Sequence, residues 1–526
     1  MDDVANDRSA TIAANWLLDP VFGWTVVAAV VVFVLLYRFS TSGHDRWRIA
    51  NVPHDRPMPL FGNAFRILTG IESPQEFFDR AYKRFAGEKV CGMYQMTTPL
   101  LLARDPELIS RITVRDFGHF NSRGMNTSPE NNVLAGSLFF LKGDRWKTMR
   151  QKLSPGFTTN RLKDAQDRIV ECVDRLTMTI DQQMSVSDGE GIEFKKLTAN
   201  FSTNVIATCA FGLKLDQTSE FIKYGNKMFQ SRIRQIVVQM LIMLCPRLVQ
   251  FFGLKQFPED SINFYRAVFT DLIRYRHENN VVGNDVAQTL MQARKELVLD
   301  GGDLTDKAKF TELDIVSNAI LLFVAGSEIV SITISFMLYE LALNKDVQNK
   351  VREEIITVIK KNGGQLSYNC IADLHYLNKV SEEVSRLYSI TLMLFREATE
   401  DYKVPDMSLV IRKGEKIVIP TYSIHHDPKY YPDPFKFDPE RFSEEEKSKR
   451  PNGTYLPFGN GPRLCLGKRL AELELKLAVS IILQKYEVMP CKKTEIPIQV
   501  KAPTGFLSPK NDLWLCFKPI AVHNDN

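Results

Sequence analysis

The stretch Pro457–Arg469 reads P-F-G-N-G-P-R-L-C-L-G-K-R and holds one cysteine, Cys465, between two glycines. Gly461 and Gly467 let the backbone turn tightly and come close to a flat, bulky group. The apolar-periodic run that follows predicts a helix, so the sulfur stands at a helix N-terminus, where free N–H groups and the helix dipole favour a thiolate. A buried structural cysteine is the alternative, and an isolated cysteine is usually one.

The spacing of the other residues in this stretch argues against that alternative. The pattern Phe458-x-x-Gly461-x-Arg463-x-Cys465-x-Gly467 has roughly a one-in-ten-thousand chance of arising from composition alone. A thiolate that faces a planar cofactor, with an arginine beside it, is what a haem iron held by cysteine requires. The segment resembles the haem-ligand loop of the cytochrome P450 family. This resemblance implies a haem b cofactor whose iron takes Cys465 as its axial ligand, with Phe458, Arg463 and Gly467 as further cofactor-binding residues.

The composition is that of an ordinary globular protein with enough apolar residues for a large core. Of 526 residues, 44% are hydrophobic and 25% are charged, and no Gly-, Ser- or Pro-rich linker interrupts residues 60–520. We therefore expect one large domain behind the N-terminal segment. The net charge of +5 is mild and gives no reason to expect nucleic acid as a partner. The eight cysteines are scattered without a C-x-x-C pair, which fits reduced thiols better than a disulfide framework.

An uncharged run of 17 residues, Val21–Tyr37, is just long enough to span a bilayer. Acidic residues dominate the segment before it, and arginines follow at positions 38, 46 and 48. By the positive-inside rule, we expect an anchor in the endoplasmic reticulum membrane with the rest of the chain on the cytosolic face. A cleaved signal peptide is the alternative, but no small-residue cleavage site follows the run. The predicted boundaries are 1–37 for the N-terminal segment and anchor, 38–63 for a proline-rich linker, and 64–526 for the haem-thiolate catalytic domain.

Three residues outside the cysteine stretch are candidate partners of the haem propionates. Trp146 and Arg150 are four positions apart in a predicted helix and therefore share one face. An indole N–H and a guanidinium on one face suit a propionate, although an amphipathic surface helix with a packed tryptophan is the alternative. Arg396 matches the strand arginine that reaches a propionate in the family.

Asp116–Gly124 resembles the family's loop over the substrate pocket.

The longest helical pattern, Thr311–Asn344, opens with T-E-L-D, which is typical of a capping box. In its centre Ala325 and Gly326 are small and leave room for a planar cofactor and a bound diatomic molecule. The segment resembles the family's oxygen-binding segment, which places an acidic residue and then a threonine here. Glu328 keeps the acid, whereas Ile329 replaces the threonine. We take these four as the candidate catalytic residues.

The isoleucine leaves the reaction open. Cleaving the bond between two oxygen atoms needs protons, and the threonine hydroxyl organises water that delivers them; isoleucine has no hydroxyl. Thr333 shares the face of Ile329 one turn away, whereas Ser327 and Ser331 point elsewhere. Either Thr333 or the substrate supplies the hydroxyl, or the reaction needs fewer protons. The hypotheses are a monooxygenase of lipophilic compounds, a haem-thiolate isomerase or dehydratase of peroxides, and a weakly catalytic haem protein that binds ligands.

Charged residues downstream match the family's structural cluster. Glu383 and Arg386 are three positions apart on a predicted helix, and Arg441 supplies a third charge, so we expect a cluster that positions the cysteine loop. A weak surface ion pair is the alternative for the first two. Ser389 stands where the family usually has proline, which predicts a looser pocket wall. We interpret His425 and His426 as packing or hydrogen-bonding residues and not as metal ligands.

The resemblance runs from the anchor to about residue 517. It is closest to the animal microsomal branch, and especially to insect enzymes that clear toxins, pesticides and plant compounds. It implies a mainly helical single-domain fold with a small β region. It also implies electrons from NADPH through NADPH–cytochrome P450 reductase, cytochrome b5 as a second candidate partner, a lipophilic small-molecule substrate and contact with membrane lipid. Basic residues that could form the docking face are Arg145, Lys147, Lys152, Lys468 and Arg469.

Overall fold

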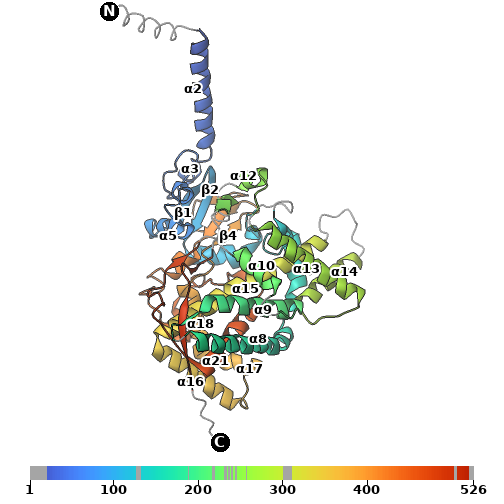
Figure 1. Ribbon diagram of the computed structural model, residues 1–526. Helices are drawn as coiled ribbons and strands as arrows, with labels where there is room; N and C mark the ends of the chain where they lie inside the picture. The colour runs from blue at the N-terminus through green and yellow to red at the C-terminus, as the bar shows by residue number, and fades with distance from the viewer. Residues whose placement is uncertain are drawn as a thin grey trace, which may run out of the picture.

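The protein is mainly helical with small β-sheets, so the predicted fold class is confirmed. Figure 1 shows the helices gathered in one body and the sheet of β1, β2 and β4 towards one end of it. The computed structural model describes residues 20–125, 132–187, 189–215, 219–229, 246–255, 257–299, 311–502 and 506–520, together with positions 234, 237, 238, 241 and 242.

The sheet that carries Arg396 has the order β1-β2-β7-β4, formed by Val90–Gln95, Thr98–Ala103, Lys416–Ile419 and Leu394–Glu397. The β2–β7 pair is parallel and the other two pairs are antiparallel. β2 and β7 lie in the middle, and most of their side chains are buried, as expected for aliphatic central strands. Pairing of β4 with β7 fixes the position of Arg396 opposite Ile417.

The central helix is α15 (Glu312–Leu343), which packs against α9 (Phe194–Phe211), α18 (His375–Leu387) and α21 (Lys468–Lys485). It begins with the predicted capping box: the Asp314 N–H donates to the Thr311 hydroxyl at 3.2 Å, and the Asp314 carboxylate accepts from the Thr311 N–H at 2.8 Å. By length and composition α15 could cross a membrane, but more than half of its most apolar window is buried in protein. It is therefore a core helix.

The N-terminal helix α2 (Pro20–Ser40) projects from the body at the end where α3, β1 and β2 lie (Figure 1). Its apolar side chains from Trp24 to Phe39 are exposed. The chain then returns to the body at Trp47, which is fully buried and donates its indole N–H to the Met93 carbonyl at 2.8 Å. The Gly92 N–H donates to the Pro53 carbonyl at 2.8 Å. The segment predicted as a proline-rich linker, residues 38–63, thus makes contacts with β1.

The remaining elements surround this core. The other helices are α3 (Arg46–Ile49), α4 (Phe65–Leu68), α5 (Pro74–Arg84), α6 (Pro106–Ser110), α7 (Gly143–Leu153), α8 (Thr159–Val186), α10 (Glu220–Phe229), α12 (Pro246–Phe251), α13 (Glu259–Glu278), α14 (Val286–Leu299), α16 (Lys345–Lys361), α17 (Tyr368–Asp373), α19 (Thr421–His425) and α20 (Glu444–Lys449). Short turns of helix are η1 (Arg111–Arg115), η2 (Phe117–Phe120), η3 (Val133–Gly136), η4 (Ser154–Phe157), η5 (Pro439–Phe442) and η6 (Gly461–Arg463). The other strands are β3 (Ile192–Glu193), β5 (Tyr402–Lys403), β6 (Val410–Ile411), β8 (Tyr486–Met489), β9 (Val500–Lys501), β10 (Ser508–Pro509) and β11 (Trp514–Pro519).

Candidate haem-thiolate site

Cys465 lies in a tight loop between η6 and α21, with Gly467 as the residue before the first turn of the helix. The Cys465 N–H donates to the Phe458 carbonyl at 2.9 Å, which closes the loop. Gly461 has φ +66°, and a Cβ there would overlap the carbonyl oxygen of Thr113. Only glycine meets both conditions without strain. The loop is therefore held against η1 by a close contact between two backbones.

The thiol of Cys465 lies deep in the protein and yet presents open surface. Burial raises its pKa, while the N–H groups of Gly467 and Lys468 and the charges of Arg150 and Arg123 act in the opposite direction. Of the cysteines in the described residues, Cys465 is the one whose side chain is exposed. A residue that is both deeply placed and accessible faces an internal opening. Ala325 is likewise exposed although it lies in the middle of the buried helix α15.

Four arginines lie close together near this sulfur. Burial lowers the pKa of Arg463, Arg123 and Arg396, and mutual repulsion among the arginines lowers the pKa of the first two further. Burial also lowers the pKa of Arg150, which the nearby Cys465 partly offsets. Because guanidinium groups stay protonated, a cluster of this kind needs an anion close by. Two propionates would supply that negative charge.

Three of the predicted propionate partners keep free donors. The buried Nε of Arg396 has no hydrogen-bond partner, and its Nη1 donates to the Phe395 carbonyl at 2.8 Å. Within the described part of the chain, the indole N–H of Trp146 and the guanidinium of Arg150 have no hydrogen bond or ion pair. The orphaned Nε of Arg396 is costly inside a protein unless a ligand accepts from it. Trp146, Arg150 and Arg396 therefore fit a haem whose propionates would accept from them.

The hydrogen bonds of Arg463 go to the protein backbone, whereas the sequence pattern suggested contact with the cofactor. Its guanidinium donates to the carbonyls of Asn121 at 2.6 Å, Leu141 at 2.8 Å and Leu138 at 3.3 Å, and it stacks 4.2 Å from the ring centroid of Trp146. These contacts use most of its donors on the backbone. Arg463 therefore ties the cysteine loop to the segment before α7.

Arg123 belongs to the cluster although the sequence pattern did not single it out. It donates to the Phe139 carbonyl at 2.9 Å and stacks 4.4 Å from the centroid of the Phe139 ring. Its charge interacts with those of Arg396, Cys465 and Arg150. The sequence does contain a feature that could have identified it: Arg123 is the one Lys or Arg between Arg115 and Lys142, and it lies in a loop expected to cover the pocket.

The centre of α15 departs from the expected arrangement in two ways. A Cβ on Gly326 would lie 2.7 Å from Cδ1 of Ile206, so this glycine allows close packing with α9, whereas the sequence predicted room for a cofactor. The carboxylate of Glu328 accepts from Lys195 Nζ of α9 at 3.0 Å. Ile329 is partly buried, on the same face as the exposed Ala325 four residues earlier.

The hydroxyls near Ile329 are engaged by the helix itself. Thr333 Oγ1 donates to the Ile329 carbonyl at 2.8 Å. Ser327 donates to the Phe323 carbonyl at 2.8 Å, and Ser331 donates to the Glu328 carbonyl at 2.9 Å. Bonds of this type to a carbonyl three or four residues back are common for Ser and Thr in helices. In this conformation, none of the three hydroxyls has its proton free for a ligand.

Comparison with known proteins identifies the family. The chain matches the family model described as Cytochrome P450 over residues 52–517. The chain belongs to the cytochrome P450 family. It is 34% identical over 504 residues to the "Probable cytochrome P450 6a14" of Drosophila melanogaster, which covers 93% of this chain and 98% of that protein. Cytochrome P450 6k1 of Blattella germanica is 34% identical over 509 residues (94% and 96%). Cytochrome P450 9e2 of the same insect is 33% identical over 524 residues (95% and 98%).

A cytochrome P450 is a monooxygenase that contains haem iron with an axial cysteine thiolate. The family works with a redox partner and takes lipophilic substrates. The accessible thiol of Cys465, the open surface at Ala325 and the arginines with free donors fit that cofactor.

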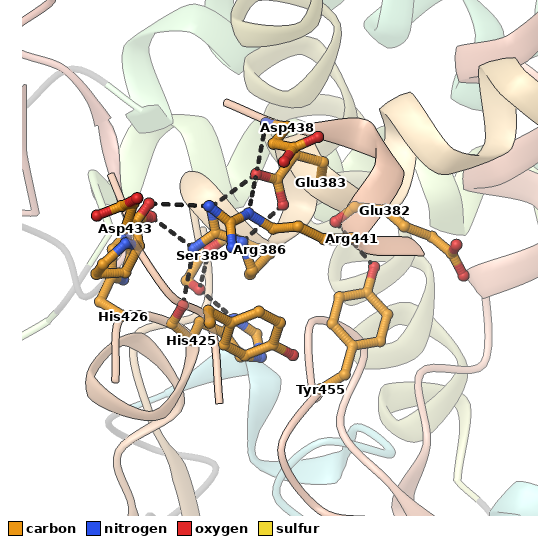
Figure 2. A network of polar contacts seen from close by, with 12 residues as sticks. Glu382, Glu383, Arg386, Ser389, His425, His426, Asp433, Asp438, Arg441 and Tyr455 are labelled. Carbon is orange, nitrogen blue, oxygen red and sulfur yellow. Dashed lines mark hydrogen bonds and ion pairs between the residues drawn. The ribbon is translucent and has the colours of Figure 1, made fainter. Parts of the chain in front are cut away.

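This cytochrome P450 also carries a network of charged residues around the buried carboxylate of Glu383 (Figure 2). Arg386 donates to both carboxylate oxygens of Glu383, at 2.6 and 2.8 Å, and neither side chain has exposed area. Arg441 Nε lies 3.5 Å from the same carboxylate, which also accepts from the Asp438 N–H at 3.0 Å. Arg386 Nη1 donates to the carbonyls of His425 and Pro434. The predicted Glu383–Arg386–Arg441 cluster is confirmed, and a weak surface pair is excluded.

The two histidines have structural partners. His426 stacks on Tyr422 at 4.1 Å between ring centroids, and burial lowers its pKa to about 4. Burial also lowers the pKa of His425 well below its usual value, so both rings are neutral. Ser389, predicted to loosen the pocket wall, instead makes a hydrogen bond to Nδ1 of His425.

A cavity of about 690 Å³ lies elsewhere in this cytochrome P450. It is lined by residues of α8, α9, β3 and β11, including Cys172, Lys196, Phe201 and Trp514. None of the predicted site residues lines it. It is therefore separate from the chemistry at Cys465.

Proposed function

We propose that this protein inserts one oxygen atom of O2 into small lipophilic substrates, with electrons that come from NADPH through NADPH–cytochrome P450 reductase. The observation that supports it best is the accessible thiol of Cys465 beside a cluster of arginines that makes no ion pair with the described residues. When bound, the haem supplies oxygen binding and activation, which the thiolate promotes by donating electron density to the iron.

In this proposal each residue near the cofactor has a stated task. Cys465 provides the axial thiolate, which the N–H groups of Gly467 and Lys468 stabilise. Trp146, Arg150, Arg396 and Arg123 would donate to the propionates. Three further residues shape the loop: Gly461 permits its approach to η1, Arg463 ties it to the segment before α7, and Phe458 accepts the Cys465 N–H on its carbonyl.

On α15, Ala325 leaves open surface and Ile329 on the same face adds an apolar side chain, and these two residues would line the substrate side of the bound cofactor. A lipophilic substrate fits walls of this kind, because burying a charged group there would leave it unpaired. The segment after β9 offers a further apolar side chain: Phe506 is partly exposed and pairs with Thr391 through a backbone bridge, whereas Leu507 is buried. We assign Phe506 to the pocket wall.

We infer that α2 anchors the protein in the endoplasmic reticulum membrane with the catalytic body on the cytosolic face. Three observations support this: its apolar surface is exposed, it stands clear of the body, and arginines follow it. Phe251 and Phe252 are exposed at α12, which lies at the same end of the body as α2 (Figure 1). They would add a second contact with membrane lipid.

The face next to Cys465 is our candidate for reductase docking. Lys147 and Arg469 are exposed there, and the first residue of α21 is Lys468. Arg145 is also exposed, but it pairs with Asp314 at 3.2 Å. An acidic partner would be attracted to this face, and the rate of association should fall as ionic strength rises. Cytochrome b5 is a second candidate for the same face.

The test is reconstitution of the full-length holoprotein with reductase, NADPH and a panel of lipophilic compounds. We expect the thiolate-type band in the carbon monoxide difference spectrum of the reduced protein, and products that carry oxygen from O2. Consumption of NADPH with peroxide as the sole product would contradict the proposal. Absence of the thiolate-type band in folded protein would contradict the assignment of Cys465.

A second candidate function follows from Ile329 and the engaged hydroxyls around it. An isomerase or dehydratase of peroxides receives both oxygen atoms with its substrate and needs fewer protons. It predicts turnover of lipid hydroperoxides or endoperoxides without reductase and without O2. Ligand-induced spectral shifts with no product under either condition would instead indicate a ligand-binding haem protein.

A further inference from the structure

Ser389 is buried and takes part in an unbroken chain of hydrogen bonds (Figure 2). Its hydroxyl lies within hydrogen-bond distance of His425 Nδ1 and donates to the Arg386 carbonyl at 2.9 Å. On the other side of the imidazole ring, Nε2 accepts from the Leu456 N–H at 2.9 Å. The chain thus runs from the backbone of α18 to the segment that leads into the cysteine loop.

The direction of each bond follows from this geometry. Because His425 Nε2 accepts from a backbone N–H, it carries no proton, so the proton of the neutral ring is on Nδ1. Nδ1–H therefore donates to the Ser389 oxygen, and the Ser389 proton goes to the Arg386 carbonyl. The neutral ring is consistent with the burial of His425. Every donor and acceptor in the chain has one partner.

Leu456 connects this chain of bonds to the sulfur. Its carbonyl accepts from the Gly459 N–H at 3.0 Å, and the Phe458 carbonyl accepts from the Cys465 N–H at 2.9 Å. The neighbouring Tyr455 is fastened to the same helix, because its hydroxyl donates to the Glu382 carbonyl at 3.2 Å (Figure 2). His425 stacks on Tyr455 with 5.7 Å between ring centroids. The start of the loop is thus held to α18 at two successive residues.

We propose that Ser389 is a positioning residue for the haem-ligand loop: through His425, its hydroxyl fixes the backbone at Leu456 and thereby the place of Cys465. The proposal rests on Cys465 as the haem ligand. The family's usual proline could not make this contact, because a proline at position 389 has no hydroxyl to accept from His425. The proposal also assigns a role to the serine that replaces the family's usual residue.

Replacing Ser389 with alanine leaves the Nδ1–H of His425 without an acceptor inside the protein. An unpaired buried donor is unfavourable, so the ring should shift or turn and release the Leu456 N–H. In the S389A holoprotein we expect the thiolate-type band to be lost about tenfold faster on incubation, and the Leu456 amide to exchange with solvent about tenfold faster. S381A is the matched control, because Ser381 lies on α18, the helix whose Arg386 carbonyl accepts from Ser389, and makes no hydrogen bond to the described residues.

A double-mutant cycle tests whether the effect passes through His425. In H425F the ring is replaced by an aromatic side chain without hydrogen bonds, so adding S389A should change neither rate further. Three results would overturn the proposal: unchanged rates in S389A, equal acceleration in S381A, or faster exchange spread over all core amides. If the wild-type protein shows no thiolate-type band, the proposed function fails, and exchange at Leu456 still decides whether Ser389 positions the loop. If H425F does not fold, the comparison of S389A with S381A decides.

Discussion

Lys195 of α9 and Glu328 of α15 form an ion pair with 3.0 Å between Nζ and the carboxylate oxygen, beside the candidate oxygen-binding segment. The pair joins the two helices at the level where Gly326 packs against Ile206. Glu328, one of the four candidate catalytic residues, is therefore also a helix-packing residue. Any role of Glu328 in catalysis has to operate together with Lys195.

Replacing Lys195 with methionine should weaken the contact between α9 and α15. Both side chains are partly accessible, so we expect a loss of about 1 kcal/mol in the free energy of unfolding. K196M is the matched control, because the adjacent Lys196 is exposed. Urea unfolding followed by circular dichroism measures the difference. Equal midpoints for K195M and the wild type would show that the ion pair makes no net contribution.

Ile329→Thr tests the distal side directly. The threonine would place a hydroxyl beside Ala325, whereas the protons of the Ser327, Ser331 and Thr333 hydroxyls are engaged by helix carbonyls. Under the monooxygenase proposal we expect a severalfold rise in product formed per NADPH consumed. Ile329→Val is the control, because it keeps the β-branched shape without a hydroxyl. Unchanged coupling in Ile329→Thr would mean that protons reach the site by another route.

The sequence predicted what depends on local pattern and spacing. The capping box at Thr311 and the pairing of Glu383 with Arg386 follow from intervals of three residues, which chain geometry alone sets. The fold class could be predicted too, because the cysteine loop resembles one family closely.

What the sequence could not predict depends on which segments meet in space. Gly326 packs against Ile206 of α9, which is 120 positions earlier in the chain. The residues next to Gly326 in the sequence give no indication of this contact. Arg463 donates to carbonyls of the segment before α7, so its donors are occupied although its spacing matches the family. Arg123 joins the cluster for a similar reason: a loop folds over the site and carries it there.

Gly461→Ala should prevent the cysteine loop from closing. The new Cβ would overlap the Thr113 carbonyl, and the alanine backbone would have to keep φ at +66°. Together these two effects cost roughly 2–5 kcal/mol in the free energy of unfolding. Gly363→Ala is the matched control, because Gly363 also has positive φ (+81°) but nothing lies within 4 Å of its Cβ position. We expect the thiolate-type band to be lost in the first variant and kept in the second. A normal band in Gly461→Ala would show that η1 can move away.

The buried carboxyl of Glu474 in α21 predicts a pH dependence of stability. Burial raises its pKa to about 8, with the nearby Ser202 acting weakly in the other direction, and its Oε1 has no hydrogen-bond partner. In the unfolded chain the pKa of the same group is near its ordinary value of 4.5. Between these values the folded protein binds a proton that the unfolded chain lacks. The stability that this proton contributes is complete below the lower value and is lost as pH rises through the upper one.

Glu474→Gln removes this titration while keeping the shape of the neutral acid. Relative to the wild type, the variant should therefore gain about 1.4 kcal/mol in the free energy of unfolding for each pH unit between about pH 5 and about pH 8. Glu472→Gln is the control, because Glu472 lies on the same helix and pairs with Lys468 at the protein surface. Unfolding midpoints at several pH values give the comparison. Parallel pH profiles for Glu474→Gln and the wild type would mean that Glu474 is already ionised in the folded protein, and a buried cation or water would then have to be found beside it.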